Sequence, residues 1–137
     1  MRFTRVLLGI FALLLSGAAI TLVSQEKAPL NHVSYTYALT SEQTMRGWVV
    51  EAKDFQCLVT GTVGSHITVK NETSSIEVHL APATFMKQYE INIRKGDKVT
   101  IVGSKITYEG KSALIAKSVA IGNETYNFRD QSGKPLW

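Results

Sequence analysis

The sequence predicts a mostly β domain of five strands and one short helix, preceded by an N-terminal hydrophobic helix that directs export. Three observations predict this class. Residues 6–23 contain no charged side chain and follow a short basic start. Further along, short segments alternate apolar and polar residues between turn residues, which is typical of strands. A single segment after Pro82 has helical spacing instead.

The first 25 residues have the pattern of a signal peptide or signal anchor. Arg2 and Arg5 precede the apolar run, and a basic start followed by an apolar stretch is typical of a signal sequence. The small residues 16–18 suit cleavage after Ala18. As a helix, the run would measure about 27 Å, close to the thickness of a bilayer core, so an uncleaved anchor stays open. Either outcome places the rest in the periplasm, free or anchored to the inner membrane.

Residues 26–44 are polar and lack a clear period, which indicates a linker or arm, with 33–37 as a candidate edge strand. The folded domain is expected at 45–137. Cys57 is the sole cysteine of the 137-residue chain, so an internal disulfide is excluded and the domain must be held by its core. Because Cys57 lies in an apolar run, we expect a buried thiol.

The first strands are predicted from residue type and alternation. Residues 46–52 and 55–63 are rich in β-branched and aromatic side chains. Residues 66–70 and 75–80 alternate around the turn residues 71–74 and predict a hairpin. Its alternation directs one set of side chains to the core, namely Ile67, Val69, Ile76, Val78 and Leu80. It directs the other set outward, namely His66, Thr68, Lys70, Glu77 and His79.

The second half starts with a break in the strand pattern. Pro82 ends the hairpin, and residues 83–90 suit a short helix with one apolar side. Residues 99–108 and 112–121 then predict a long hairpin around the turn 109–111. A last short strand is expected at 125–129.

This order of elements, with the helix between the third and fourth strands, is that of an OB-fold, a five-stranded Greek-key barrel. Residues 93–105 (IRKGDKVTIVGSK) resemble the GD-x-V-x-V-x-G-S segment of small exported bacterial OB-fold proteins. Residues 128–137 resemble their C-terminal signature, and 78–82 are similar to their V-H-L-G-P turn, with Ala81 in place of glycine. A weaker likeness is to the OB-like domain of magnetosome-associated proteins. These resemblances imply the fold and the compartment.

Two histidines form the first candidate site. The hairpin register sets His66 opposite His79, with Cβ atoms about 4.5–5.5 Å apart, and Glu77 lies close by on the same face. Two imidazoles and a carboxylate are ligands for Zn²⁺ or Cu²⁺. The alternative is a pair of solvent-facing polar residues that bind nothing. No haem is expected, because the sequence lacks the Cys-x-x-Cys-His motif that some of the magnetosome-associated proteins carry.

A second candidate site is a ligand-binding groove formed by Trp48, Lys105, Tyr108 and Arg129. OB-folds bind extended chains by stacking aromatic rings on bases or sugars and by placing cations along phosphates. The net charge is +4, and two of the positive charges are Arg2 and Arg5 of the export segment. A nucleic-acid partner is therefore not expected for an exported domain with so weak a field. The alternative is rim aromatics and ordinary surface lysines.

No catalytic motif is present: the sequence has no Gly-x-Ser-x-Gly elbow, and residues 61–64 lack the ending of a phosphate loop. We therefore expect a non-enzymatic OB-fold binding module of the bacterial cell envelope. Its partner would be an envelope protein, an oligosaccharide or a small ligand, with contact to the inner membrane through residues 6–23 if these are retained. The alternatives are a periplasmic metal-binding domain using the histidine pair and a domain that binds single-stranded nucleic acid.

Overall fold

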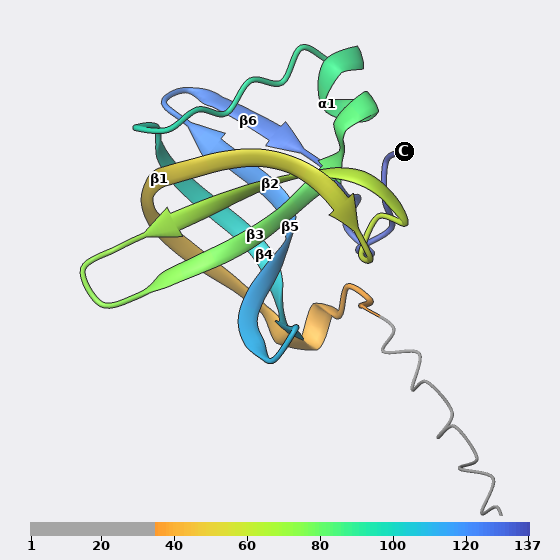
Figure 1. Cartoon of the computed structure of the whole chain (residues 1–137), viewed down its shortest axis with the longest axis horizontal. Helices are drawn as coiled ribbons and strands as arrows, with labels where there is room; N and C mark the ends of the chain where they lie inside the picture. The colour runs from red at the N-terminus through yellow and green to blue at the C-terminus, as the bar shows by residue number, and fades with distance from the viewer. Residues whose placement is uncertain (1–34) are drawn as a thin grey trace, which may run out of the picture. The chain divides into compact units, whose positions relative to one another are not determined.

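The computed structural model describes residues 35–137; the predicted export segment and most of the predicted linker lie outside the described residues. The elements are η1 (Leu39–Ser41), β1 (Glu42–Cys57), β2 (Thr62–Lys70), β3 (Ser75–Pro82), α1 (Ala83–Gln88), β4 (Lys98–Tyr108), β5 (Lys111–Ile121) and β6 (Glu124–Asn127) (Figure 1). No helix in this part of the chain is long and apolar enough to cross a bilayer.

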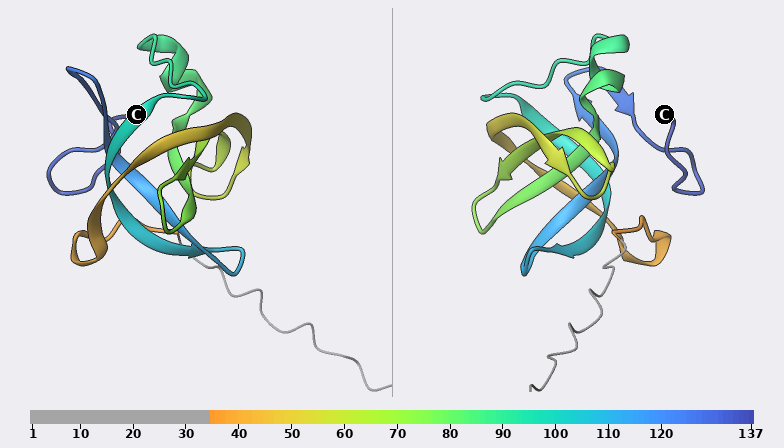
Figure 2. Two further views of the ribbon diagram at one scale, coloured as in Figure 1. Left: turned by 90° about the vertical axis from the view of Figure 1, so that its left-hand side faces the viewer. Right: turned by 45° about the vertical axis from the view of Figure 1, so that its right-hand side comes forward.

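The strands of the described part form one sheet in the order β3-β2-β1-β4-β5-β6. All neighbouring strands are antiparallel, and β3 also pairs in parallel with β5, where Val78 lies opposite Leu114. Strands β1 to β5 therefore form a closed circuit of pairings that winds around a common centre (Figure 2), with β6 outside it. The chain is mostly β, with one short helix between β3 and β4, an OB-fold-like arrangement as predicted.

The first strand differs from the prediction. The segments 46–52 and 55–63 were expected as separate strands, but Glu42–Cys57 is one strand of 16 residues, and the turn falls at 58–61. Gly61 has a φ of 71°, which glycine adopts without strain, so the chain reverses there. An irregularity between Val49 and Glu51 bends β1, whose first half pairs with β4 and whose second half pairs with β2.

The start of the domain also differs from the prediction. The first strand begins at Glu42 rather than near Met45, and residues 35–37 are not part of a strand. Two of these residues instead dock onto the domain through their rings. Tyr35 packs against Tyr108, with ring centroids 4.8 Å apart, and the Tyr37 ring contacts the Arg129 guanidinium at 5.4 Å. The arm predicted as a linker therefore belongs to the domain from Tyr35 onward.

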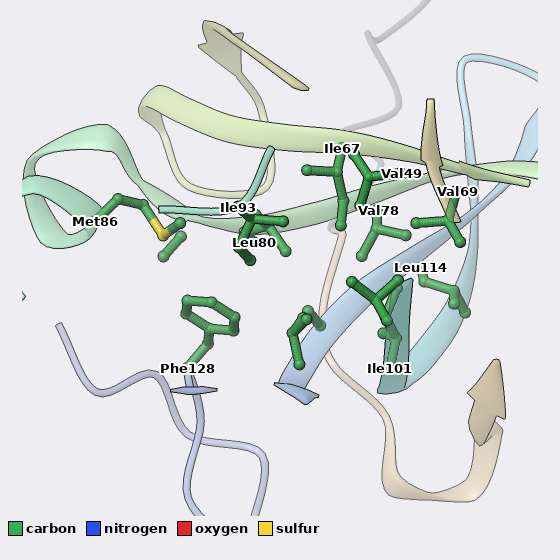
Figure 3. Packing of buried hydrophobic residues seen from close by; sticks show 14 of the residues in the cluster. Val49, Ile67, Val69, Val78, Leu80, Met86, Ile93, Ile101, Leu114 and Phe128 are labelled. Atoms are coloured by element: carbon green, nitrogen blue, oxygen red, sulfur yellow. The ribbon is translucent and has the colours of Figure 1, made fainter. Parts of the chain in front are cut away.

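The core follows from the alternation of the strands. The hairpin register is as predicted, with Val69 opposite Ile76 and Lys70 opposite Ser75. Side chains from β1, β2 and β3 face side chains from β4 and β5, and Phe128 closes one end beneath Leu80 and Met86 (Figure 3). Burying each large aliphatic side chain stabilises the fold by roughly 1.5–3 kcal/mol. Ile76, predicted for this core, is only partly buried.

The short helix α1 supplies two of the core side chains. It ends at Gln88, earlier than the predicted Glu90, which has a φ of 51° and cannot continue the helix. Phe85 and Met86 are buried, whereas Tyr89 is exposed. The helix therefore covers one end of the core with a single turn of apolar residues.

Candidate metal centre

The cross-strand histidine pair is the centre of the candidate site. His66 of β2 lies opposite His79 of β3, as the hairpin register predicts. The expectation that both rings face solvent is wrong, because each residue is only 1% exposed. Alternation correctly separates them from Ile67 and Val78, but Phe55 and Tyr108 cover the face on which they lie. A second buried cluster therefore lies across the hairpin from the apolar core.

Cys57, at the end of β1, is the third member of this cluster. Its sulfur is fully buried and lies 3.3 Å from His79 Nδ1. The sulfur and one ring nitrogen from each histidine all lie within 4.8 Å of one another. The predicted third ligand, Glu77, lies elsewhere: its Oε1 is 3.4 Å from His79 Nε2, on the other side of the ring. The converging donor set is thus Cys57, His66 and His79.

Aromatic rings fix the orientation of both imidazoles. Phe55 is stacked on His66, with centroids 3.7 Å apart and an interplanar angle of 12°. Tyr108 packs against His79 at 4.4 Å, and the two histidine rings meet edge to face at 4.6 Å. Such ring contacts restrict rotation of the side chains. The donor atoms are therefore held in place before any ligand arrives.

The electrostatics of the cluster favour neutral imidazoles. Burial, the largest cause, lowers the pKa of His66 to about 4, and the nearby Gly64 backbone only partly offsets it. Burial also lowers the pKa of His79 to about 4, with a further contribution from His66. At neutral pH both rings are uncharged and present lone pairs, as metal ligation requires. Burial raises the pKa of the Glu77 carboxyl.

Several nitrogen atoms of the cluster are buried without an aligned hydrogen bond. Both ring nitrogens of His66, and Nε2 of His79, have no such partner in the part of the chain that the structure describes. An unpaired buried polar group costs about 1–3 kcal/mol, so a fold that keeps one usually gains something from it. The orphaned nitrogens surround the same space as the Cys57 sulfur, which indicates a ligand that accepts lone pairs.

Two hollows flank the cluster. The larger, of about 1000 Å³, is a groove lined by Phe55, Glu77 and Tyr108 together with the charged residues Lys53, Glu109 and Lys111. The smaller, of about 400 Å³, includes His66 and Asp54 in its lining. The groove brings solvent to the edge of the cluster at Glu77, whose side chain is 30% exposed. An ion therefore has a short route to the buried donors.

The residues predicted for a ligand-binding groove do not share one surface. Trp48 is exposed and lies opposite Lys98, the first residue of β4, with Lys98 Nζ 5.9 Å from its ring. Tyr108, the last residue of β4, is buried against His79. Lys105 is exposed and takes part in none of the contacts of the cluster. Tyr108 alone therefore lines the groove beside the candidate centre.

Arg129 joins the two ends of the described chain. Its guanidinium lies 5.4 Å from the Tyr37 ring and 5.1 Å from the Trp137 ring. Its Nη1 donates a hydrogen bond of 2.9 Å to the carbonyl of Gly133, and the residue is 8% exposed. We call this contact of Tyr37, Arg129 and Trp137 the aromatic clamp. Its buried guanidinium holds the arm and the tail rather than a ligand.

Comparison with known proteins gives one family and several distant structural likenesses. Residues 41–126 match the model of the MamS/MamX magnetosome protein family. No curated protein matches the sequence. The structure is similar to a chain of the S. pombe Stn1–Ten1 complex, at 15% identity over 61% of this chain and 59% of that chain, with a TM-score of 0.48. It is also similar to the second OB-fold domain of replication protein A from Methanococcus maripaludis, at 21% identity over 63% and 88% of the two chains, with a TM-score of 0.44.

Proposed function

The chain belongs to the MamS/MamX magnetosome protein family, and we propose that its OB-fold-like domain is a non-enzymatic metal-binding module of the bacterial cell envelope. One observation carries the proposal: a thiol and two imidazoles, all buried, converge within 4.8 Å. This domain would hold one metal ion per chain between β1, β2 and β3.

The chemistry of the donors supports a metal ion over other ligands. Thiolate sulfur and imidazole nitrogen are the preferred ligands of zinc and copper. In a four-coordinate zinc site the ligand atoms lie about 3.3–3.8 Å apart, so the 4.8 Å cluster would contract by about 1 Å on binding. Binding would give partners to the orphaned imidazole nitrogens. It would also displace the thiol proton, so binding is expected to weaken at low pH.

The envelope location is proposed from the sequence of the first 25 residues. Arg2 and Arg5 before an apolar run support export to the periplasm, with or without an inner-membrane anchor. A fusion of residues 1–30 to a reporter that is active only in the periplasm tests this. An active reporter supports export, and an inactive one in cells that make the fusion contradicts it.

The test of metal binding is equilibrium dialysis of the reduced full-length protein against Zn²⁺ and against Cu⁺ held by a buffering ligand. We expect one ion per chain and protection of Cys57 from a thiol reagent. Cys57→Ser should lose most of this binding, while Lys105→Ala, an exposed change away from the cluster, should retain it. Equal binding by wild type and Cys57→Ser would refute the proposed site.

The groove supports a second candidate function, which is capture of an oligosaccharide or small ligand. Its lining combines the rings of Phe55 and Tyr108 with Lys53 and Lys111, a mixture that suits sugar rings bearing acidic groups. Thermal unfolding with and without envelope glycans tests it, because a ligand that binds only the folded state raises the midpoint. An unchanged midpoint at millimolar glycan would count against this function and would leave the metal site unaffected.

A further inference from the structure

The orientation of His79 decides which groups can share one ion. Its Nδ1 lies 3.3 Å from Cys57 Sγ, and its Nε2 lies 3.4 Å from Glu77 Oε1. The two nitrogens of an imidazole point in different directions, so an ion bound at one of them cannot also be bound at the other. An ion that bridges His79 and Cys57 must use Nδ1. Glu77 then lies outside the coordination sphere, although its residue type made it the predicted third ligand.

Glu77 nevertheless has a defined place beside the ion. Its carboxylate can accept a hydrogen bond from the Nε2–H of His79, which fixes the tautomer whose lone pair is on Nδ1. Metal-ligating histidines commonly donate their second nitrogen to a carboxylate in this way. Glu77 is therefore a positioning residue for the site.

The number of donors distinguishes between metals. Across residues 35–137, the group that converges has three members: Cys57, His66 and His79. Zinc takes four ligands, and where the protein supplies three, the fourth is a water. The three donors are at most 1% exposed and are packed against Phe55 and Tyr108, so a water ligand would have to displace an aromatic ring. A trigonal set of one cysteine and two histidines is instead typical of copper.

Charge points to the same metal in its lower oxidation state. Cu⁺ with one thiolate and two neutral imidazoles carries no net charge, whereas Zn²⁺ with the same ligands leaves one positive charge. An uncompensated charge is costly in a buried site. The one carboxylate against the described cluster is that of Glu77, which is partly exposed to the groove and shares its charge with solvent.

We propose that the ion is Cu⁺, held in a three-coordinate site by Cys57 Sγ, His79 Nδ1 and one ring nitrogen of His66. This inference rests on the proposed metal-binding function. On binding, the S–H bond of Cys57 breaks, a sulfur–copper bond forms and the proton leaves to solvent, while copper keeps its oxidation state. The groove beside Glu77 gives the ion its way in.

The test is X-ray absorption on the reduced full-length protein, loaded without oxygen with Cu⁺ and, separately, with Zn²⁺. We expect one Cu⁺ per chain with one sulfur and two nitrogen neighbours, retained against equimolar Zn²⁺. Cys57→Ser should lose the sulfur neighbour and stoichiometric binding. Glu77→Leu, which removes the hydrogen-bond acceptor, should lower the Cu⁺ affinity about 10–100-fold. Glu77→Gln keeps an acceptor oxygen and should bind within a few-fold of wild type, as should Glu72→Gln, a control in the hairpin turn.

The outcomes separate this inference from the proposed function. A fourth oxygen neighbour on copper, or displacement of Cu⁺ by equimolar Zn²⁺, would overturn the copper assignment. Equal Cu⁺ affinity in wild type and Glu77→Leu would overturn the role of Glu77. Zn²⁺ bound by Cys57 with Cu⁺ bound elsewhere would overturn the copper assignment and keep the metal-binding function. Binding of neither ion by folded wild type would refute the function itself.

Discussion

The two faces of the β2–β3 hairpin are both buried, yet their polar atoms are treated differently. On one face, Ile67, Val69 and Val78 pack into the apolar core and present no polar side-chain atom that needs a partner. On the other face, His66 and His79 are as fully buried, but three of their four ring nitrogens lack an aligned hydrogen bond. The first face is complete as it stands. The second face gains from a ligand, and this difference is what marks it as a site.

The largest effect should come from breaking the complete face. Phe128→Ala removes a fully buried ring that closes the core and should lower the free energy of unfolding by about 3–5 kcal/mol. Urea unfolding of the full-length protein measures it. Lys105→Ala, on the surface, is the control and should change stability by less than about 0.5 kcal/mol. A loss below about 1 kcal/mol for Phe128→Ala would mean that the ring is not part of the core.

Acid should act on the histidine face. Burial lowers the pKa of His66 and His79 from 6.5 to about 4, so above pH 6.5 the rings are neutral in both folded and unfolded protein. As the pH falls from 6.5 toward 4, the unfolded chain binds protons first, and stability should drop by up to about 3 kcal/mol per ring. Urea unfolding of the metal-free protein across this range measures the slope.

The control for the acid prediction is His66→Leu, which should lower the slope because one of the two rings is gone. His79 contributes its own part, so some dependence should remain. An identical pH dependence in wild type and His66→Leu would show that His66 does not titrate with the low pKa that its burial indicates.

A smaller effect is expected where the hairpin meets β1. A Cβ on Gly64 would lie 2.9 Å from Cys57 Cβ and 3.0 Å from Thr60 Oγ1, too close for either neighbour. Gly64→Ala should therefore push β1 away from β2, at about 1–3 kcal/mol of stability. It should also weaken metal binding, because Cys57 moves while the core face stays packed. Dialysis with Cu⁺ measures the second effect, and unchanged affinity would contradict the assigned geometry.

The smallest effect has the opposite sign. His66→Leu replaces two orphaned nitrogens with an apolar group, which removes a cost of about 1–3 kcal/mol, and it loses part of a ring contact worth about 0.5–1.5 kcal/mol. The metal-free variant should thus be more stable than wild type by about 1 kcal/mol, and it should bind no metal at the cluster. A destabilised variant in urea unfolding would mean that His66 has a partner in the metal-free protein.

The sequence predicts the hairpin well because its information is local. Alternation and the turn at 71–74 place His66 opposite His79, and the register in the structure is the same. Burial of the pair could not be predicted in this way, since the covering rings of Phe55 and Tyr108 come from β1 and β4. Local alternation defines the face of a strand, whereas distant segments decide what covers it.

Cys57 was not predicted as a donor because the turn was misplaced. With a strand expected across 55–63, Cys57 lies in mid-strand without a defined neighbour. The observed turn at 58–61 makes it the last residue of β1, next to the hairpin. Gly61 was the available signal, because a glycine before a second β-rich segment is typical of a chain reversal. The weaker of the two resemblances, to magnetosome-associated proteins, is confirmed by the family match.

The aromatic clamp gives the domain a mechanical property. The arm at Tyr37 is held by the ring contact with Arg129, and the next residue, Ala38, donates a hydrogen bond of 3.0 Å to Ser104 Oγ. Tension applied to the chain ahead of Tyr37 therefore loads the clamp and this hydrogen bond before it reaches the ladder between β1 and β4. Pulling would strip the arm first and leave the strands that carry the histidines and Cys57 unstretched. The clamp thus works as a strain relief between any tether and the metal centre.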